Sequence, residues 1–535
     1  MRRGRTPSSR VLLPVRQSSG EYRRLRRIGC AVAVLLVALA SHDAAALPDE
    51  PVVTRQEIRI RGRRLEYTAE AGRLAIRSVD TGEPHGYVFY VAYRVASPDR
   101  PRPLTFVWNG GPGSNSALLH FEAAGPKRLE GEHLVANDDT WLTATDLVFV
   151  DPVGTGFSRP ARPEYADEFY GTVGDVASIT EFVRAFRLLH DARDNPLFLV
   201  GESWGAGRAA HVGYQLLSRH VPVDGLVLIS GGAGLEPPEE AKPLIDALRI
   251  AHLAATGLWH GRTARELGRD PAALQDAAVY WVRETYAPAL ARLDALSAAE
   301  RESIAADLAR YTGLPSSRID RETLEIPPRQ YREDLLQETT LDIFDMRRTE
   351  APAPASPSAV LAYLRYELGY RTALPYLGLE DATEGYAPHG DYPRSVNERW
   401  NYATGPVSDE EAAAAIAEAM RTGSGPPKLG PPLPGTAEAV ALNPKLRVLV
   451  AAGMYDSLAN CPGNEALEEH LSPKLERAME SRCYVGGHMM YRDPDTRKRF
   501  GRDVRAFIQE SSAGIGPARQ ARSSFKEASF RLEYQ

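Results

Sequence analysis

The amino-acid sequence predicts an α/β protein with a mostly parallel central sheet and an inserted helical cap. Between residues 104 and 230, short apolar runs alternate with amphipathic helical patterns. This order is typical of a parallel sheet with right-handed crossovers. The alternation stops near Leu235, and strand patterns return only at Leu446. We therefore expect one sheet domain that is interrupted by an insertion.

The first strands are indicated by alternation and by apolar runs. Residues 53–96 alternate apolar and polar side chains and are rich in β-branched residues, which predicts about three antiparallel strands. The continuous apolar runs 104–108 and 147–150 are typical of strands that are buried on both faces. The sheet is thus expected to open antiparallel and to continue parallel.

Helical and strand patterns then follow in turn. Residues 175–190 place apolar side chains at helical spacing. An expected strand over 197–200 is followed by a helix of small residues over 206–217 and by a strand over 226–229. Two further strands, over 446–450 and 483–485, and a helix over 497–509 complete the expected sheet domain.

The insertion is expected to be a mostly helical cap. It has helical patterns such as 410–420 and few strand candidates, and its Pro- and Gly-rich segments 353–357 and 423–434 are expected loops. The last residues are small, polar and basic, as in a flexible tail. The expected parts are a signal peptide (1–46), a first part of the core (47–235), the cap (236–434), a second part of the core (435–510) and the tail (511–535).

The N-terminus predicts export. Residues 1–46 contain nine Arg, an apolar stretch over 28–40 and the small-residue site Ala44-Ala45-Ala46, which is the layout of a secretory signal peptide. The stretch is shorter than the ~20 apolar residues that span a bilayer. We expect cleavage near Ala46, a secreted or periplasmic protein, and no stable membrane insertion after cleavage. The pair Arg26-Arg27 leaves twin-arginine export open.

Charge and cysteine usage narrow the class of protein. The formal net charge is −6, and without the basic leader the chain is more acidic, which argues against nucleic acid as a partner.

If Cys30 leaves with the signal, Cys461 and Cys483 remain, and an exported protein with two cysteines invites a disulfide. Two buried free thiols are the alternative. No cluster of residues has metal-ligand spacing, so neither a metal nor a cofactor is expected.

The motif Gly201-Glu202-Ser203-Trp204-Gly205 lies between an expected strand and an expected helix. In that setting it predicts a nucleophile elbow, where the flanking glycines allow a strained turn to expose the serine hydroxyl above a sheet. A chance match is the alternative for so short a pattern. Ser203 is therefore the expected nucleophile of an α/β-hydrolase fold.

The loop Asn109-Gly110-Gly111-Pro112-Gly113 follows the expected strand 104–108. Because glycine has no Cβ, the backbone NH groups of this loop can come close to a ligand. An oxyanion hole needs such an approach, and α/β-hydrolases take one donor from a loop upstream of the serine. A plain tight turn is the alternative interpretation.

A nucleophilic serine needs a base, and the base needs a carboxylate to fix its tautomer. Asp456 follows the expected strand 446–450, and His488 follows the expected strand 483–485. These residues have the order Ser, acid, His of the α/β-hydrolases, and they lie where ligands bind, at the carboxyl ends of strands. Asp493 is a rival acid, but it follows the histidine and breaks this order.

Four motifs together resemble the serine carboxypeptidase family, as a bacterial-type member. They are Trp108–Gly113, Asp151–Ser158, Gly201–Ser203 and Gly487–Met489. The resemblance covers the sheet domain and matches the insertion only loosely. It implies an α/β-hydrolase that removes C-terminal residues from peptides through an acyl-enzyme.

The resemblance also implies roles for particular residues. It makes Ser203, Asp456 and His488 the catalytic triad. It assigns the oxyanion hole to the backbone NH groups of Gly111 and Trp204. Asn109 and Glu202 match the positions that hold the substrate's terminal carboxylate, although a buried Glu before the nucleophile could also be a structural acceptor.

The sequence departs from the family at one site residue. The family's second carboxylate-binding Glu lies two residues before a Gly-Pro, whereas Ala123 has that spacing from Gly125-Pro126 and Glu122 lies one residue too early. Either the loop bulges or the Glu pair is missing. An esterase, acyltransferase or proline-type aminopeptidase on the same triad therefore stays open. A catalytically inactive binding protein is the alternative from another class. A peptide or a small ester is the expected substrate.

Overall fold

The computed structural model describes residues 50–97, 101–350, 356–379, 396–422 and 427–514. The sheet, the cap and the candidate site all belong to the unit Pro51–Gln535. The expected signal peptide lies outside the described residues, as do most of the expected tail, most of the loop 353–357 and part of the loop 423–434.

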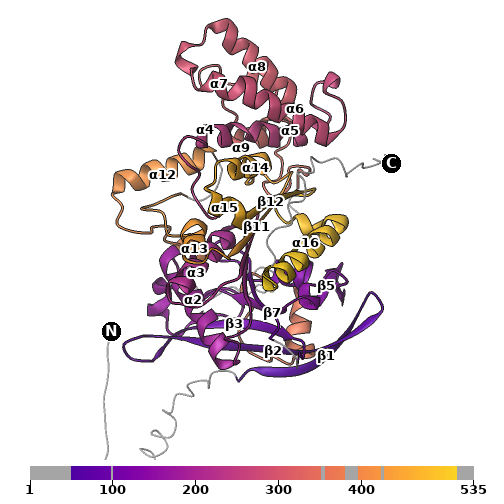
Figure 1. The fold of residues 1–535 in the computed structure, drawn as a ribbon, viewed down its shortest axis with the longest axis vertical. Helices are drawn as coiled ribbons and strands as arrows, with labels where there is room; N and C mark the ends of the chain where they lie inside the picture. The colour runs from indigo at the N-terminus through magenta and orange to yellow at the C-terminus, as the bar shows by residue number, and fades with distance from the viewer. Residues whose placement is uncertain (1–49, 98–100, 351–355, 380–395, 423–426, 515–535) are drawn as a thin grey trace, which may run out of the picture. The chain divides into compact units, whose positions relative to one another are not determined.

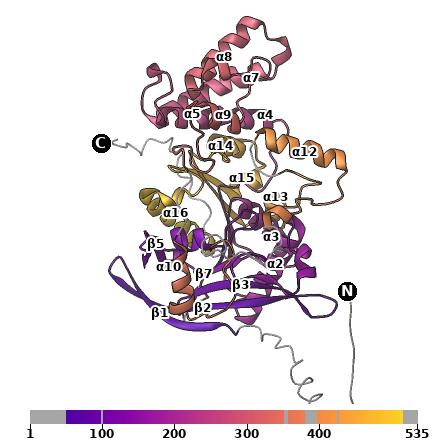
Figure 2. The same cartoon turned by 180° about the vertical axis from the view of Figure 1, so that it is seen from behind.

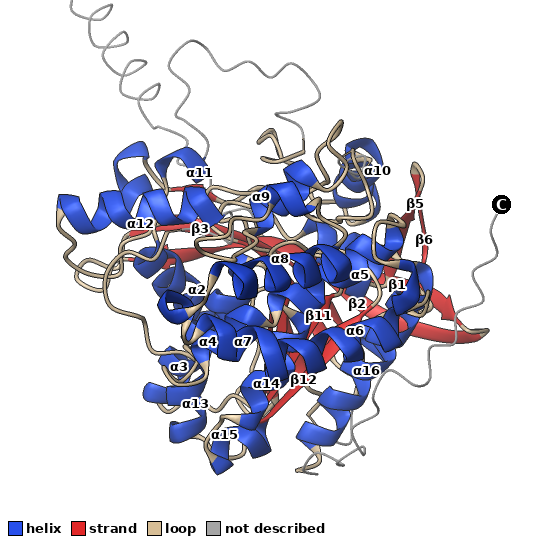
Figure 3. Cartoon of the chain, turned by 90° about the horizontal axis from the view of Figure 1, so that it is seen from above, coloured by secondary structure: helices blue, strands red, loops and turns tan. Residues whose placement is uncertain are grey.

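A 10-stranded mixed sheet forms the centre of this unit (Figures 1 and 3). Its strand order is β1-β2-β3-β7-β4-β9-β10-β11-β12, and β8 pairs with β3. The pairs from β1 to β7 are antiparallel and those from β7 to β12 are parallel. The strands are β1 (Val52–Ile60), β2 (Arg63–Arg77), β3 (Pro84–Arg94), β4 (Leu104–Trp108), β7 (Asp146–Asp151), β8 (Arg159–Pro160), β9 (Leu197–Glu202), β10 (Gly225–Ile229), β11 (Arg447–Gly453) and β12 (Met479–Tyr484).

Burial along the strands follows the sequence patterns. Strands β4, β7, β9, β10 and β11 are buried along their whole length, as continuous apolar runs in a covered parallel sheet require. Strand β1 lies at the edge of the sheet, and through most of its length exposed residues alternate with half-buried ones. The predicted antiparallel opening and parallel continuation are therefore both confirmed, and the fold is an α/β-hydrolase fold.

Helices cover both faces of the sheet. Helices α2 (Thr172–Leu189) and α3 (Trp204–Ser218) pack against each other and contribute to one hydrophobic cluster. Helix α16 (Pro494–Ser512) contributes to a separate cluster on the other face. The two clusters take alternate residues of the central strands, for example Leu199 and Val200 of β9. Each face of the sheet therefore has its own core.

The insertion is mostly helical where the structure describes it. Helix α5 packs against α6 and α8, and α14 in the second part of the core packs against α4 and α5 (Figure 1). The helices of this cap region are α4 (Lys242–Ala247), α5 (Arg249–Trp259), α6 (Pro271–Trp281), α7 (Ala287–Leu290), α8 (Ala298–Thr312), α9 (Pro328–Asp334), α11 (Val396–Arg399) and α12 (Asp409–Thr422). The second part of the core adds α13 (Thr436–Leu442), α14 (Cys461–Glu469) and α15 (Pro473–Ala478).

One part of the insertion packs elsewhere. Helix α10 (Pro357–Ala362) and the π-helix Tyr363–Glu367 lie beside β1 and β2 (Figure 2) and share a hydrophobic cluster with the antiparallel strands. A short bridge between Gly156 and Leu377 ties the following residues to the sheet domain. The insertion therefore contributes to the core of the sheet as well as to the cap.

Two smaller features were not predicted. A hairpin of β5 (Lys127–Glu130) and β6 (His133–Ala136) follows a π-helix, η1, over Leu119–Ala124.

No helix among the described residues is long and apolar enough to cross a membrane, and the apolar stretch 28–40 lies outside that part of the chain.

Candidate active site

Ser203 lies in the turn between β9 and α3. Its backbone has φ 59° and ψ −129°, a conformation that residues other than glycine rarely adopt. The turn needs glycine on both sides. A Cβ on Gly201 would lie 1.7 Å from the carbonyl oxygen of Gly205, and a Cβ on Gly205 would lie 2.7 Å from that of Asn109. The motif therefore forms the strained elbow that the sequence indicates.

The glycine loop after β4 reaches this elbow. A Cβ on Gly110 would lie 2.5 Å from the backbone nitrogen of Trp204. Trp204 is the first residue of α3, so its NH has no acceptor within the helix and lies at the positive end of the helix dipole. The next residue of the loop, Gly111, has φ 102°. The two backbone segments expected to form an oxyanion hole are thus in contact.

A buried ion pair that was not predicted from the sequence holds the glycine loop. Arg208 donates from Nη1 to the carbonyl oxygen of Asn109 at 2.8 Å and from Nε to Oδ2 of Asp175 at 2.6 Å. Burial raises the pKa of Asp175, and the charge of Arg208 opposes this shift. A charged residue in the small-residue pattern 206–217 was the available signal, because a buried arginine needs partners.

His488 and Asp456 meet at the carboxyl ends of β12 and β11. Nδ1 of His488 lies 2.7 Å from Oδ2 of Asp456, and both side chains are buried. Burial opposes protonation of His488, but the charge of Asp456, the hydrogen bond to it and the charge of Glu202 together raise the pKa of the histidine. Nε2 of His488 has no hydrogen-bond partner among the described residues. The imidazole is therefore fixed on one side and has an unoccupied nitrogen on the other.

The cap contacts the loops that carry Asp456 and His488. Nε2 of His252, on α5, lies 2.7 Å from the carbonyl oxygen of Asp456. Burial lowers the pKa of His252 to about 4, so the neutral imidazole donates this hydrogen bond near neutral pH. The carbonyl oxygen of Phe344 accepts from the backbone NH of His488 at 2.6 Å, and the two rings lie 5.2 Å apart. Neither residue has a sequence signal of its own.

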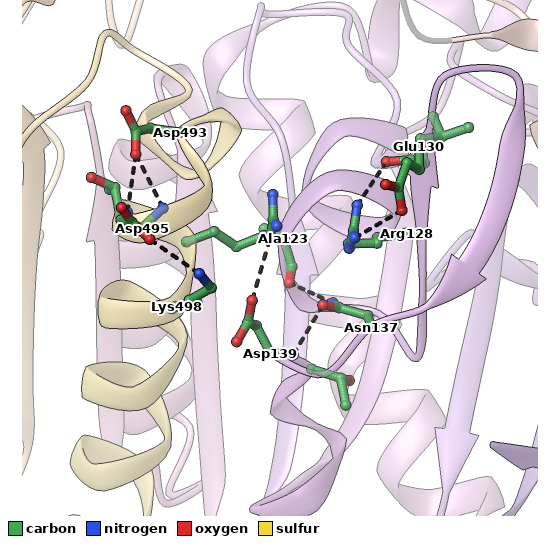
Figure 4. A network of polar contacts seen from close by, with 12 residues as sticks. Ala123, Arg128, Glu130, Asn137, Asp139, Asp493, Asp495 and Lys498 are labelled. Atoms are coloured by element: carbon green, nitrogen blue, oxygen red, sulfur yellow. Dashed lines mark hydrogen bonds and ion pairs between the residues drawn. The ribbon is translucent and has the colours of Figure 1, made fainter. Parts of the chain in front are cut away.

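The rival acid Asp493 has another role. Its carboxylate accepts hydrogen bonds from the backbone NH groups of Asp495 and Thr496, both at 3.2 Å (Figure 4). It is therefore the N-cap of helix α16. In the part of the chain that the structure describes, no group of three His, Cys, Asp or Glu side chains is arranged to hold a metal ion.

Asn109 and Glu202 form a buried pair beside the elbow. Nδ2 of Asn109 donates to Oε1 of Glu202 at 2.8 Å, and Oδ1 of Asn109 accepts from the backbone NH of Leu119 at 3.1 Å. Burial raises the pKa of Glu202, although the charge of His488 and hydrogen bonds from Tyr491 and Asn109 act against the rise. The structure thus brings together the two residues expected to hold a carboxylate.

Glu122 lies on the π-helix η1, whose hydrogen bonds span five residues in place of the four of an α-helix. It makes a two-pronged ion pair with Arg492, with distances of 2.5 Å from Nε to Oε2 and 2.9 Å from Nη2 to Oε1. Its charge also raises the pKa of Glu202. The one-residue offset of Glu122 in the sequence is therefore accompanied by a π-helical bulge, and the carboxylate lies within electrostatic reach of Glu202.

Cys461 and Cys483 form a disulfide with an S–S distance of 1.99 Å. Cys461 begins helix α14 shortly after Asp456, and Cys483 lies in β12 shortly before His488. The bond therefore joins the segments that carry Asp456 and His488.

Replacing both cysteines by serine is expected to lower the free energy of unfolding by about 3 kcal/mol, because the closed loop restrains the unfolded chain. The sequence separation that sets this loop is 22 residues. Urea denaturation of the unreduced protein and of the double variant measures the difference. Two titratable thiols in the unfolded, unreduced protein would contradict the bond.

Part of this chain is similar to a known protein family. Residues 70–221 match the family model described as serine carboxypeptidase. The pheromone-processing carboxypeptidase KEX1 of Meyerozyma guilliermondii is 30% identical over 173 residues, which cover 30% of this chain and 26% of the relative. That of Neurospora crassa is 29% identical over 211 residues, which cover 37% and 28%.

Among solved structures, the prohormone-processing carboxypeptidase Kex1(delta)p of Saccharomyces cerevisiae matches with a TM-score of 0.45 and 15% identity over 84% of this chain and 94% of that one. The matched region of this chain spans only about a quarter of the length of the curated relatives named above. These relatives are fungal and give no support to the expected bacterial type. Residues 70–221, which contain the glycine loop and the elbow, relate this α/β-hydrolase to the serine carboxypeptidase family.

Proposed function

We propose that this protein is a serine-type carboxypeptidase that removes C-terminal residues from peptides. The observation that carries the proposal is the position of the Asn109–Glu202 pair directly beside the strained Ser203 elbow. A buried amide and a carboxyl with a raised pKa suit a substrate that ends in a free carboxylate. The family match over residues 70–221 supports the same activity.

In the proposed reaction, the Ser203 hydroxyl attacks the carbonyl carbon of the last peptide bond while Nε2 of His488 takes its proton. Asp456 keeps the other imidazole nitrogen protonated and stabilises the imidazolium that forms. The backbone NH groups of Gly111 and Trp204 donate to the oxyanion. His488 then protonates the leaving amine, and water hydrolyses the acyl-enzyme.

The proposal is tested with a peptide mixture whose C-termini are either free or amidated. Mass analysis is expected to show stepwise loss of single residues from the C-terminus, faster for the free acids. Loss of residues from the N-terminus would support a proline-type aminopeptidase instead. Cleavage of small esters without loss of any peptide residue would support an esterase or acyltransferase.

The esterase or acyltransferase alternative has one observation in its favour. Glu122 is engaged by Arg492, so it is not free to share a proton with Glu202 in the way that the family's pair of Glu residues does. A weaker hold on the substrate carboxylate would reduce the preference for free peptides. The comparison of free and amidated peptides decides between the two functions.

The pH dependence of kcat/KM should differ between these two substrate classes. His488 must be neutral to act as a base, and its raised pKa moves the acidic limb of the profile to higher pH. Glu202 must be protonated to donate to a substrate carboxylate, and its raised pKa extends that form to higher pH before it is lost. Free-acid peptides are therefore expected to give a bell-shaped profile, whereas amidated peptides lack the alkaline limb.

Glu202→Gln, which donates at every pH, is expected to flatten the alkaline limb for free-acid peptides. Steady-state kinetics across pH measure the effect. Identical profiles for the two substrates in the unaltered enzyme would contradict the role of Glu202.

We also propose that the protein acts outside the cytoplasm. The basic and apolar layout of residues 1–46 and the Cys461–Cys483 disulfide support export to an oxidising compartment. N-terminal sequencing of the mature protein tests this proposal, with cleavage near Ala46 as the expected result.

A further inference from the structure

Two buried polar atoms near the Asn109–Glu202 pair lack a hydrogen-bond partner of normal geometry among the described residues. They are Oε2 of Glu202 and the hydroxyl of Tyr491. Both side chains are almost completely buried. The interaction with Tyr491 lowers the pKa of the Glu202 carboxyl, so the hydroxyl lies close to Glu202 although no hydrogen bond of normal geometry joins the two groups. Unsatisfied buried polar groups are rare in native proteins and call for an explanation.

Tyr491 is placed by the same turn that carries His488. Gly486 has φ 145°, and a Cβ on it would lie 2.7 Å from Cα of Met490. The chain can therefore fold back tightly on itself after β12. It then forms the short 3-10 helix η9, Met490–Arg492. One turn of the chain thus carries the catalytic histidine, the buried tyrosine and Arg492.

Arg492 compensates the negative charge of Glu122. Its guanidinium binds both carboxylate oxygens of Glu122, and each side chain of this pair is largely buried. Without Arg492, the negative charge of Glu122 would repel an incoming carboxylate, because a nearby like charge disfavours the charged form of a group. With Arg492 bound, the pair is neutral overall.

Separate polar contacts hold the two segments that carry this ion pair. Ala123 follows Glu122 directly. Asn137 donates to the carbonyl oxygens of Ala123 and Gly125, both at 2.9 Å. Directly after Arg492, Asp493 caps helix α16 (Figure 4). The segments η1 and η9 also pack against each other. The backbone positions of Glu122 and Arg492 are therefore supported by contacts outside their ion pair.

We propose that Tyr491 and Arg492 complete the subsite for the terminal carboxylate of the peptide substrate. The Tyr491 hydroxyl donates a hydrogen bond to that carboxylate, together with the second N–H of the Asn109 amide and the protonated Glu202. Arg492 neutralises Glu122, so that the subsite accepts a negative charge. This inference rests on the proposed carboxypeptidase function and assigns to it two binding residues that a paired-Glu site would not contain.

The chemistry of each group suits this role. Burial, with the charges of Glu202 and Glu122, raises the pKa of Tyr491 well above its ordinary value, so its hydroxyl is a donor at every working pH. Asn109 uses one N–H on Glu202 and its oxygen on Leu119, which leaves one N–H for a ligand. The Tyr491 hydroxyl has one proton, which it gives either to Glu202 or to a bound carboxylate. When it turns to the ligand, three donors serve a carboxylate, which is acceptor-only.

Tyr491→Phe removes only the hydroxyl and is the main test. The measured quantity is the ratio of kcat/KM for a free-acid peptide to that for the same peptide with an amidated C-terminus. Loss of one hydrogen bond to a charged group is expected to lower this ratio about 10-fold to 100-fold, through KM of the free acid. Tyr286→Phe is the matched control. It removes another buried hydroxyl, which donates to the carbonyl oxygen of Leu324 at 2.7 Å in the cap, and is expected to keep the ratio.

A second set of variants tests Arg492. Arg492→Gln leaves the Glu122 charge uncompensated and is expected to lower the same ratio about 10-fold or more. The double variant Arg492→Gln with Glu122→Gln removes both charges and is expected to recover most of the ratio. Fluorophosphonate labelling of Ser203 shows whether each variant is folded. A folded double variant that does not recover would overturn the neutralising role of Arg492.

The outcomes separate this inference from the proposed function. If the unaltered enzyme hydrolyses free and amidated peptides equally well, the carboxypeptidase proposal fails and the inference fails with it. If the unaltered enzyme prefers free acids but Tyr491→Phe keeps that preference, only the inference is overturned. A Tyr491→Phe variant that slows both substrates by the same factor would show that Tyr491 merely supports the structure around His488.

Discussion

Ser203→Ala is expected to abolish both fluorophosphonate labelling and peptide hydrolysis. The hydroxyl is the only group that the substitution removes, and the elbow that exposes it is fixed by glycines on both sides. Removal of a nucleophilic serine from a working triad lowers kcat by roughly 10⁶-fold. Single-turnover assays with an activated ester, and mass analysis of the labelled protein, measure the loss.

Ser218→Ala is the control for this experiment. Ser218 lies on the same helix, α3, and its hydroxyl donates to the carbonyl oxygen of Gln215 at 2.9 Å. Both labelling and turnover should survive this substitution. Labelling of the Ser203→Ala variant at another serine would overturn the assignment of the nucleophile.

Asp456→Asn is expected to lower kcat about 10⁴-fold, as loss of the carboxylate does in triads of this kind. The present carboxylate accepts from Nδ1–H of His488 through Oδ2 and from the backbone NH of Leu458 through Oδ1, at 2.9 Å. An asparagine can keep the bond to Leu458, but its NH₂ group then faces Nδ1. The imidazole must take the wrong tautomer, in which Nε2 cannot accept a proton from Ser203.

The pH profile gives a second readout of the same variant. The charge of Asp456 raises the pKa of His488 against the effect of burial, so its loss should move the acidic limb of kcat/KM to lower pH. Asp493→Asn, at the rival acid, is the matched control. Asparagine is as good an N-cap as aspartate, so this variant should keep both the rate and the profile. A larger loss in Asp493→Asn than in Asp456→Asn would reverse the assignment.

Local sequence patterns were sufficient to predict most of the central strands and the elbow. The runs that became β4, β7 and β9 are apolar throughout because both faces of a parallel strand are covered. The elbow is readable because steric limits at Gly201 and Gly205 leave no other residue type. Asp456 and His488 were found because strand ends of a parallel sheet share one edge.

The tertiary contacts around the candidate site could not be predicted in this way. Tyr491 and Arg492 meet Glu202 and Glu122 only because η9 packs against a π-helix, and a sequence pattern does not show where a helix takes an extra residue. His252 of the cap contacts Asp456 of the sheet domain. A single buried histidine belongs to no sequence pattern that would predict this contact. Such pairs depend on tertiary packing between distant segments.

The order of the proposed catalytic groups along the chain has a consequence for biosynthesis. The elbow belongs to β9 and α3, whereas the acid and the base follow β11 and β12, after the whole insertion. A ribosome therefore completes the nucleophile long before the residues that activate it, and α5 must be in place to hold the acid loop through His252. A nascent or truncated chain that ends within the insertion has the serine without a base. If the protein is a peptidase, its chain is thus inactive during synthesis until the end of the sheet domain has been made.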